Sequence, residues 1–267
     1  MAKIGFIGMG NMGTAIMRGL LKTYKPEELL FTSAHEAKMQ KITEETGVAH
    51  VSTATDCAEQ VKYLVLAVKP QILPTVFKEL NGKLRKDQVV ISIAAGYAIA
   101  DLQAGLGDSA RIVRSMPNTP AMVGEGMSGV SYDEALFTDE EKDVIDGFFT
   151  SFGKMEKVDE KLMDVVGSAS GCSPAYVYMF IEALADGCVK NGLPRQAAYK
   201  MVAQAVLGSA KMVLETGKHP AELRDQVTSP GGTTIAGIYA MEKRGIRAAL
   251  IDGVKACLDR SDEMSGK

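Results

Sequence analysis

Short apolar runs alternate with segments of helical periodicity through the first half of the chain. The runs are continuous rather than alternating, which is typical of parallel strands buried on both faces. We predict strands at residues 4–7, 29–32, 63–68, 89–94 and 112–116. Helical patterns lie between them, at residues 11–23, 34–46 and 72–80. This order predicts right-handed crossovers and an α/β, doubly wound sheet, with edge strands at 129–132 and 155–158 around a helix at 139–149.

The pattern changes class near residue 160, after which strand signals disappear. Helices are predicted from Ser173, as an N-cap before Pro174, to Gly192, and then at residues 194–216, 220–227, 233–243 and 246–264. Their apolar positions spread over more than one face, so these helices must be buried. They could be core helices packed on the sheet domain, but we expect a bundle between two subunits. We predict two domains, residues 1–160 and 161–267.

Composition narrows the functional classes. Apolar residues make up 46% of the chain, charged residues 24%, and the formal net charge is −3, as in a soluble globular protein. A slightly acidic balance argues against nucleic-acid binding. The four cysteines and three histidines lack metal-ligand spacing, so we expect no metal and reduced thiols. No apolar segment is long enough to cross a membrane, and no signal peptide precedes the first strand, so we expect a cytoplasmic protein.

A glycine pattern follows the first predicted strand. Residues 8–13 read GMGNMG, a G-x-G-x-x-G sequence between a strand and a helix. In that context the glycines permit a tight turn, close approach of a pyrophosphate and close helix–strand packing, while the helix N-terminus offers N–H groups to phosphates. The alternative is a glycine-rich turn without a ligand. The pattern predicts a Rossmann-type, dinucleotide-binding domain.

The residues after the second predicted strand bear on the cofactor. An NAD enzyme usually places Asp or Glu about 20 residues beyond the glycine motif, on the ribose 2′-hydroxyl. Ser33 lies at that distance, and His35 and Lys38 follow it. No carboxylate stands at Ser33 to repel a 2′-phosphate, although Glu36 adds negative charge nearby. We therefore expect NADPH, with NADH possible. An exposed residue at a helix start is an equally good interpretation of His35.

Further candidate sites lie at strand ends and in the helical half. Open α/β sheets bind ligands beyond the carboxyl ends of their strands, and residues 67–70 (AVKP), 92–96 (SIAAG) and 114–120 (RSMPNTP) stand at such ends. Small residues there admit a flat ring and prolines hold rigid loops, unless these segments merely end strands. Residues 229–234 (SPGGTT) combine hydroxyls, two glycines and a helix start. They predict a nest for a small carboxylate, with a plain capped helix start as the alternative.

These blocks, in this order, resemble pyrroline-5-carboxylate reductase. The resemblance is carried by residues 3–13, 67–70, 92–96, 116–120, 170–176, 208–212 and 229–234, and it covers nearly the whole chain. It implies an oxidoreductase that reduces 1-pyrroline-5-carboxylate to L-proline with NADPH or NADH, the last step of proline biosynthesis. It also implies a Rossmann domain followed by an all-α dimerisation domain, which interlocks as a homodimer and could form a decamer of five dimers.

The resemblance implies roles for individual residues. Those along the cofactor are Ile7, Gly8, Met9, Gly10, Asn11 and Met12 at the pyrophosphate, Ser33 at the adenosine phosphate, and Ala67, Val68, Lys69, Pro70, Ala94 and Ala95 at the ribose and nicotinamide. Those that hold the substrate are Ser229, Gly231, Gly232, Thr233 and Thr234. Thr234 is expected to be catalytic, with its hydroxyl hydrogen-bonded to the ring nitrogen. Two positions depart from the family pattern: Thr55 replaces an asparagine that contacts the ribose in some members, and Cys172 stands where Ser or Gly is common.

Two alternative functions fit parts of the sequence. A β-hydroxyacid dehydrogenase shares the glycine pattern and a helical second domain, but its chemistry needs a base, typically a helix lysine, which residues 167–178 lack. A regulatory module that binds NADP without turnover would leave SPGGTT without a purpose. Reduction of a protonated imine needs no separate activating acid, because positioning can supply most of the catalysis. This agrees with the absence of a Ser-His-Asp arrangement.

Overall fold

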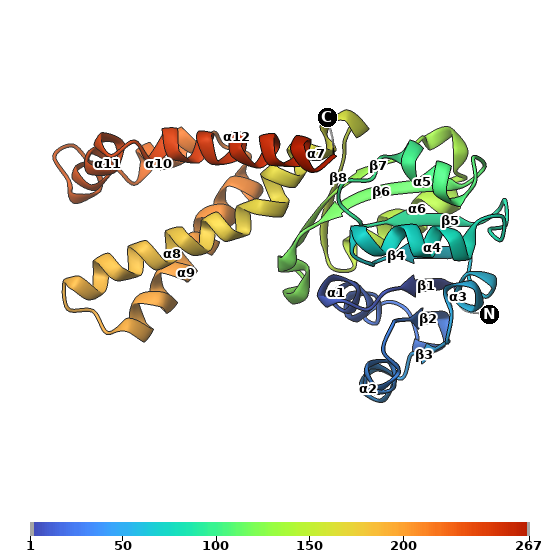
Figure 1. Ribbon diagram of the computed structural model, residues 1–267. Coiled ribbons are helices and arrows are strands. Elements are labelled where there is room, and N and C mark those ends of the chain that lie inside the picture. The colour runs from blue at the N-terminus through green and yellow to red at the C-terminus, as the bar shows by residue number, and fades with distance from the viewer. Residues whose placement is uncertain (1–2, 266–267) are drawn as a thin grey trace. The chain divides into compact units, whose positions relative to one another are not determined.

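The computed structural model describes residues 3–265, which divide into two compact units (Figure 1). The first unit runs to Cys172 and includes the residues from Arg260 on, and the second is Ser173–Asp259. Each unit has its own architecture and is described by itself. The predicted boundary at residue 160 stays a prediction.

One sheet of eight strands forms the centre of the first unit within the described residues. The strands are β1 (Ile4–Ile7), β2 (Leu29–Thr32), β3 (Ala49–His50), β4 (Tyr63–Leu66), β5 (Val89–Ser92), β6 (Arg111–Pro117), β7 (Gly126–Ser131) and β8 (Gly153–Lys157). Their order is β3-β2-β1-β4-β5-β6-β7-β8, and all neighbours are parallel except β6 and β7. Strands β1, β2, β4 and β5 are buried along their whole length, which explains their unbroken apolar sequences.

Helices cover both faces of this sheet. They are α1 (Asn11–Leu20), α2 (Glu36–Thr46), α3 (Ala54–Glu59), α4 (Leu73–Leu80), α5 (Ile99–Leu106), α6 (Asp139–Thr150) and α7 (Met163–Val166). One apolar core joins α1, α2 and α6 to the sheet, and a second core joins α3, α4 and α5 to it. This two-sided cover confirms the predicted α/β, doubly wound Rossmann-type fold.

The second unit is all-helical. It contains α8 (Ser173–Lys190), α9 (Arg195–Thr216), α10 (Pro220–Gln226), α11 (Thr233–Lys243) and most of α12 (Ile246–Ser265). Few of its side chains are buried, namely Ala185, Ala198 and Val202. Large apolar side chains are exposed instead, such as Met179 (68%) and Leu214 (82%). The apolar side chains of these helices therefore do not form a closed core within this unit.

The sequence predictions for the elements differ from the structure mainly at the ends. Strand β4 ends at Leu66 and β5 at Ser92, so the following small residues are loops. The predicted N-cap at Ser173 is wrong. Residues Gly167–Cys172 form a π-helical stretch that continues from α7 into α8, so the backbone is already helical before Ser173. Pro174 therefore lies within a continuous helical segment and not in its first turn. Strand β3 and helices α3, α5 and α7 were not predicted.

Candidate functional site at the strand ends and the SPGGTT turn

The carboxyl ends of the central strands are level with one another. Ile7 pairs with Thr32 on β2 and with Leu66 on β4, and Leu66 pairs with Ser92 on β5. The ladder continues for one residue beyond these strands: Gly8 N donates to Thr32 O at 2.9 Å, Ala67 N to Ile7 O at 2.8 Å and Ile93 N to Leu66 O at 3.2 Å. The segments predicted to follow the cofactor thus begin side by side at one edge of the sheet.

Two of the three glycines after β1 are required by the packing of the protein itself, and the third is not. Gly8 has φ of +97°, and an added Cβ would lie 2.7 Å from the Ala67 carbonyl oxygen. At Gly13 an added Cβ would lie 2.7 Å from the Gly8 carbonyl oxygen, so α1 can approach the turn only without a side chain. Gly10 differs from both, because its Cβ would meet nothing within 4 Å.

The open space at Gly10 lies at the N-terminus of α1. Gly10 is the N-cap residue and no side chain caps the helix. The first amides of a helix have no intrahelical partner, and the helix dipole adds positive potential at this end. An exposed glycine, exposed Asn11 and uncapped amides fit the pyrophosphate of a dinucleotide.

Ser33 directly follows β2 and is half-buried, whereas His35 and Lys38 are exposed. His35 is the N-cap residue of α2, and its side chain makes no capping hydrogen bond. The carboxylate of Glu36 contacts His50 at 3.2 Å and Gln40 at 3.4 Å. The region after β2 therefore combines a hydroxyl, basic side chains and one carboxylate that has a partner of its own.

The two loops predicted along the nicotinamide are bonded to each other. Tyr97, after the Ala94–Ala95 pair, donates its hydroxyl to the carbonyl of Pro70 at 3.4 Å. Ser115 donates its hydroxyl to the Ser92 carbonyl at 3.0 Å, which fixes the start of the second loop. Tyr97 directly follows the predicted segment 92–96. Its hydrogen bond to Pro70, however, could not be predicted from the sequence.

An ion pair anchors the far end of the second loop. Glu160 Oε1 accepts from the backbone N of Ile99, the first residue of α5, at 2.6 Å. Arg114 on β6 holds the same oxygen at 3.1 Å and contacts Asp164 on α7 at 3.7 Å. Arg114 is only 7% exposed, whereas the carboxylates of Glu160 and Asp164 are partly exposed. No sequence pattern marks Glu160, because its partners lie 46 and 61 residues away.

Asn118 lies in the predicted segment 114–120, and both the nitrogen and the oxygen of its side-chain amide form hydrogen bonds with backbone groups. Nδ2 donates to the carbonyl of Ser170 at 3.0 Å, and Oδ1 accepts from Met127 N at 2.9 Å. This residue ties the end of β6 to β7 and to the π-helical stretch. The contacts favour the interpretation that this segment ends a strand and positions its neighbours.

The SPGGTT sequence forms a turn that runs into α11. Gly232 N donates to the Ser229 carbonyl at 3.1 Å, and Gly231 has φ of +67°, as position three of a type II turn with Pro230 before it. Gly232 is the N-cap of α11 and has no side-chain cap. Thr233 and Thr234 occupy the exposed first turn. The turn, the uncapped amides and the hydroxyls are what a small carboxylate needs.

Comparisons with known proteins assign the chain to a family. Residues 160–264 match the family described as Pyrroline-5-carboxylate reductase dimerisation, and residues 3–96 match NADP oxidoreductase coenzyme F420-dependent. A protein of Escherichia coli (strain K12) named pyrroline-5-carboxylate reductase is 44% identical over 265 residues, which cover 98% of each chain. This chain belongs to the pyrroline-5-carboxylate reductase family.

Solved structures of this family have the same fold. A pyrroline-5-carboxylate reductase from Coxiella burnetii superposes with a TM-score of 0.90 at 33% identity, covering 99% of this chain and 98% of that one. A pyrroline carboxylate reductase from Plasmodium falciparum with NADP bound gives 0.87 at 33% identity, with the same coverage. The resemblance in the sequence motifs is therefore confirmed.

The two departures from the family pattern can be placed in the structure. Thr55 binds other residues of this chain: its hydroxyl donates to the Glu79 carbonyl at 3.3 Å and accepts from Lys83 Nζ at 2.9 Å. Cys172 ends the π-helical stretch. No group of side chains suited to a metal ion occurs among residues 3–263. Over the same part of the chain, no helix is long and apolar enough to span a membrane.

Proposed function

We propose that this chain is an NADPH-dependent reductase that converts 1-pyrroline-5-carboxylate to L-proline, with NADH as a possible second cofactor. The observation that carries the proposal is the pair of uncapped, glycine-bearing helix starts at α1 and α11, in a chain that belongs to this family. One suits a pyrophosphate and the other a small carboxylate. The cofactor supplies a hydride to the imine carbon.

The cofactor-binding residues proposed from the sequence fit the edge of the sheet at which β1, β2, β4 and β5 end. Ile7 to Met12 would bind the pyrophosphate at the start of α1, and Ser33 would bind the adenosine 2′-phosphate. The loops Ala67–Pro70 and Ala94–Ala95 would border the ribose and the nicotinamide. The level strand ends and the open space at Gly10 support this assignment, as does the NADP bound to the Plasmodium falciparum relative.

The substrate would bind through its carboxylate at the SPGGTT turn. Ser229, Gly231, Gly232 and Thr233 surround the uncapped amides of α11, which favour a negative charge. Thr234 Oγ1 would hydrogen-bond the ring nitrogen, donating to the lone pair of the neutral imine or accepting from the N–H of the iminium. In the iminium form the carbon accepts a hydride without another acid, so Thr234 would serve mainly to orient the ring.

Replacement of Thr234 tests this assignment. Thr234→Ala is expected to lower kcat/KM for 1-pyrroline-5-carboxylate by about tenfold or more, because one hydrogen bond near the reacting atoms is lost. Thr234→Ser retains the hydroxyl and should recover most of the activity. NADPH binding, measured by calorimetry, should stay unchanged in both variants. Unchanged kcat/KM in Thr234→Ala would remove this residue from the site.

The helical domain supports a homodimer. Its match to the dimerisation family and its exposed apolar side chains both agree with a surface that pairs with a second copy. A decamer of five dimers and the domain boundary at residue 160 are further parts of the proposal. A cytoplasmic location agrees with the four cysteines of the described residues, which form no disulfide. Light scattering that shows a monomer at all concentrations would contradict the dimer.

A further inference from the structure

The first turn of α2 places a carboxylate near the proposed 2′-phosphate site. Glu36 begins α2 and lies three residues after Ser33. Three residues span at most about 11 Å of extended chain, and charges are screened over about 8 Å at physiological ionic strength. Unless its charge is compensated, a carboxylate at this place disfavours a phosphate dianion.

His50 on the edge strand β3 contacts Glu36 through one ring nitrogen and Thr43 through the other. Nε2 lies 3.2 Å from Glu36 Oε1, and Nδ1 lies 2.8 Å from Thr43 Oγ1. The Thr43 hydroxyl donates its only proton to the Val48 carbonyl at 2.7 Å, so toward His50 its oxygen acts as an acceptor. Nδ1 therefore carries a proton. The ring can donate to Glu36 as well only as an imidazolium, with a proton on each nitrogen.

The surroundings of His50 hold the ring in this place. Its register partner on β2 is Phe31, and the two ring centroids are 5.7 Å apart. The His50 side chain is 22% exposed, whereas that of Glu36 is 60% exposed. Among the described residues, Glu36 is the charged group that contacts His50. The other groups there are the neutral Thr43 and the Phe31 ring, with Gln40 on the same Glu36 oxygen.

We propose that Glu36 and His50 form a charge-compensated pair that sets the preference of this enzyme for a cofactor with a 2′-phosphate. This inference rests on the proposed function. When His50 is an imidazolium it cancels the charge of Glu36, and a phosphate bound at Ser33 then meets a neutral pair beside the basic His35 and Lys38. Without His50, Glu36 repels the phosphate of NADP but hardly affects the hydroxyl of NAD. At physiological ionic strength, a unit charge about 8 Å from a phosphate of charge about −1.5 changes affinity by about 1.5-fold to twofold in water.

Calorimetric binding of NADP⁺ and NAD⁺ to the full-length, cofactor-free enzyme at about pH 6, where histidine is largely protonated, tests the pair. We expect His50→Gln to weaken NADP⁺ binding by about 1.5-fold to twofold and Glu36→Gln to leave it as tight as in the wild type or tighter. In the double variant, NADP⁺ affinity should return to that of the wild type, because the two opposite charge changes cancel. NAD⁺ affinity should stay constant throughout and reports that each variant is folded.

A matched control makes the same charge change farther along the helix. Glu44 is an exposed carboxylate eight residues beyond Glu36 on α2, about 12 Å along the axis, and Glu44→Gln should leave the ratio of the two affinities unchanged. The pair is overturned if the double variant binds NADP⁺ as weakly as His50→Gln does, or if NAD⁺ affinity falls in parallel. Turnover of the imine by the wild type, measured alongside, decides the proposed function separately.

Discussion

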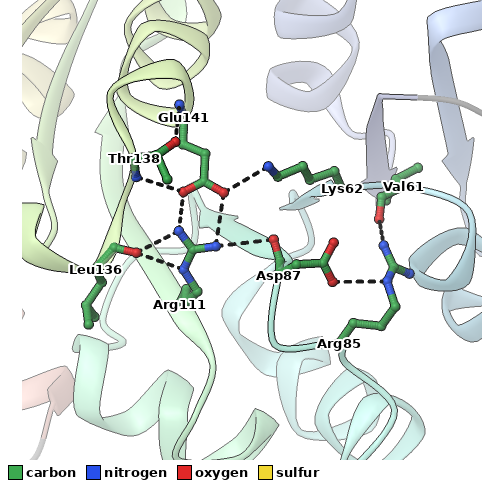
Figure 2. Close-up of polar contacts among 8 residues, drawn as sticks. All are labelled: Val61, Lys62, Arg85, Asp87, Arg111, Leu136, Thr138 and Glu141. Carbon is green, nitrogen blue, oxygen red and sulfur yellow. Dashed lines mark hydrogen bonds and ion pairs between the residues drawn. The ribbon is translucent and has the colours of Figure 1, made fainter.

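Replacing Glu141 by glutamine should destabilise the first unit and remove one source of its pH dependence. Glu141 on α6 is 3% exposed and is enclosed by cations (Figure 2). Its carboxylate accepts from Arg111 Nη1 at 3.1 Å, from Lys62 Nζ at 3.0 Å and from Thr138 N at 3.0 Å. Arg111 is itself fixed by the Leu136 carbonyl at 2.9 Å. The cluster joins β6, α6 and the residue before β4.

The magnitude follows from the pKa of this carboxyl. Hydrogen bonds from Arg111, more than those from Lys62 and Thr138, lower the pKa of Glu141 to about 2, against about 4.3 in an unfolded chain. This difference corresponds to about 3 kcal/mol at neutral pH. Because the folded pKa is lowered, the stabilisation is complete above about pH 5 and is lost as pH falls toward 2. At about pH 3.5 it should be about 2 kcal/mol.

Urea unfolding followed by circular dichroism measures this effect. The protein concentration must be held constant, since dimerisation contributes to stability. We expect Glu141→Gln to lower the free energy of unfolding by about 3 kcal/mol at pH about 7, and the gap to the wild type to narrow as pH falls. Glu134→Gln is the control: it removes an exposed ion pair with Lys157 and should change stability by at most about 1 kcal/mol. A gap that is the same at about pH 7 and about pH 3.5 would refute the reasoning.

Two further predictions concern the proposed cofactor site at the strand ends. Gly13→Ala forces a methyl group against the Gly8 carbonyl and should lower both Tm and NADPH affinity, whereas Gly10→Ala meets no protein atom and should weaken NADPH alone. Thermal melts and calorimetry separate the two, and a fall in Tm for Gly10→Ala would contradict the open space. Glu160→Ala should lower kcat by about tenfold through a loosened second loop, while Glu160→Gln, which retains an acceptor for Ile99 N, should recover most of it. Equal kinetics in both Glu160 variants would contradict this role.

Local sequence determined much of what could be predicted. The buried strands and the glycine turn after β1 follow from neighbouring residues, since continuous apolar runs and G-x-G-x-x-G each have a local cause. The Pro-Gly turn before α11 is local in the same way. These local features predict the proposed cofactor and carboxylate sites at helix starts.

The contacts that support the site depend on residues far apart in the sequence. Glu160 binds Ile99 and Arg114 from another part of the chain, and no sequence pattern links the three. His50 meets Glu36 only because β3 pairs beside β2. At Ser173 the local signature of a cap was overridden, because the π-helical stretch had already begun the helix. Tertiary packing decided each of these cases.

The central claim is tested most directly by incubating the purified enzyme with 1-pyrroline-5-carboxylate and NADPH, following the loss of NADPH absorbance and the appearance of L-proline together. The account predicts that one L-proline forms for each NADPH oxidised, and that oxidation stops when the imine is left out. Binding of NADPH without turnover of the imine, by an enzyme that is folded and dimeric, would contradict it.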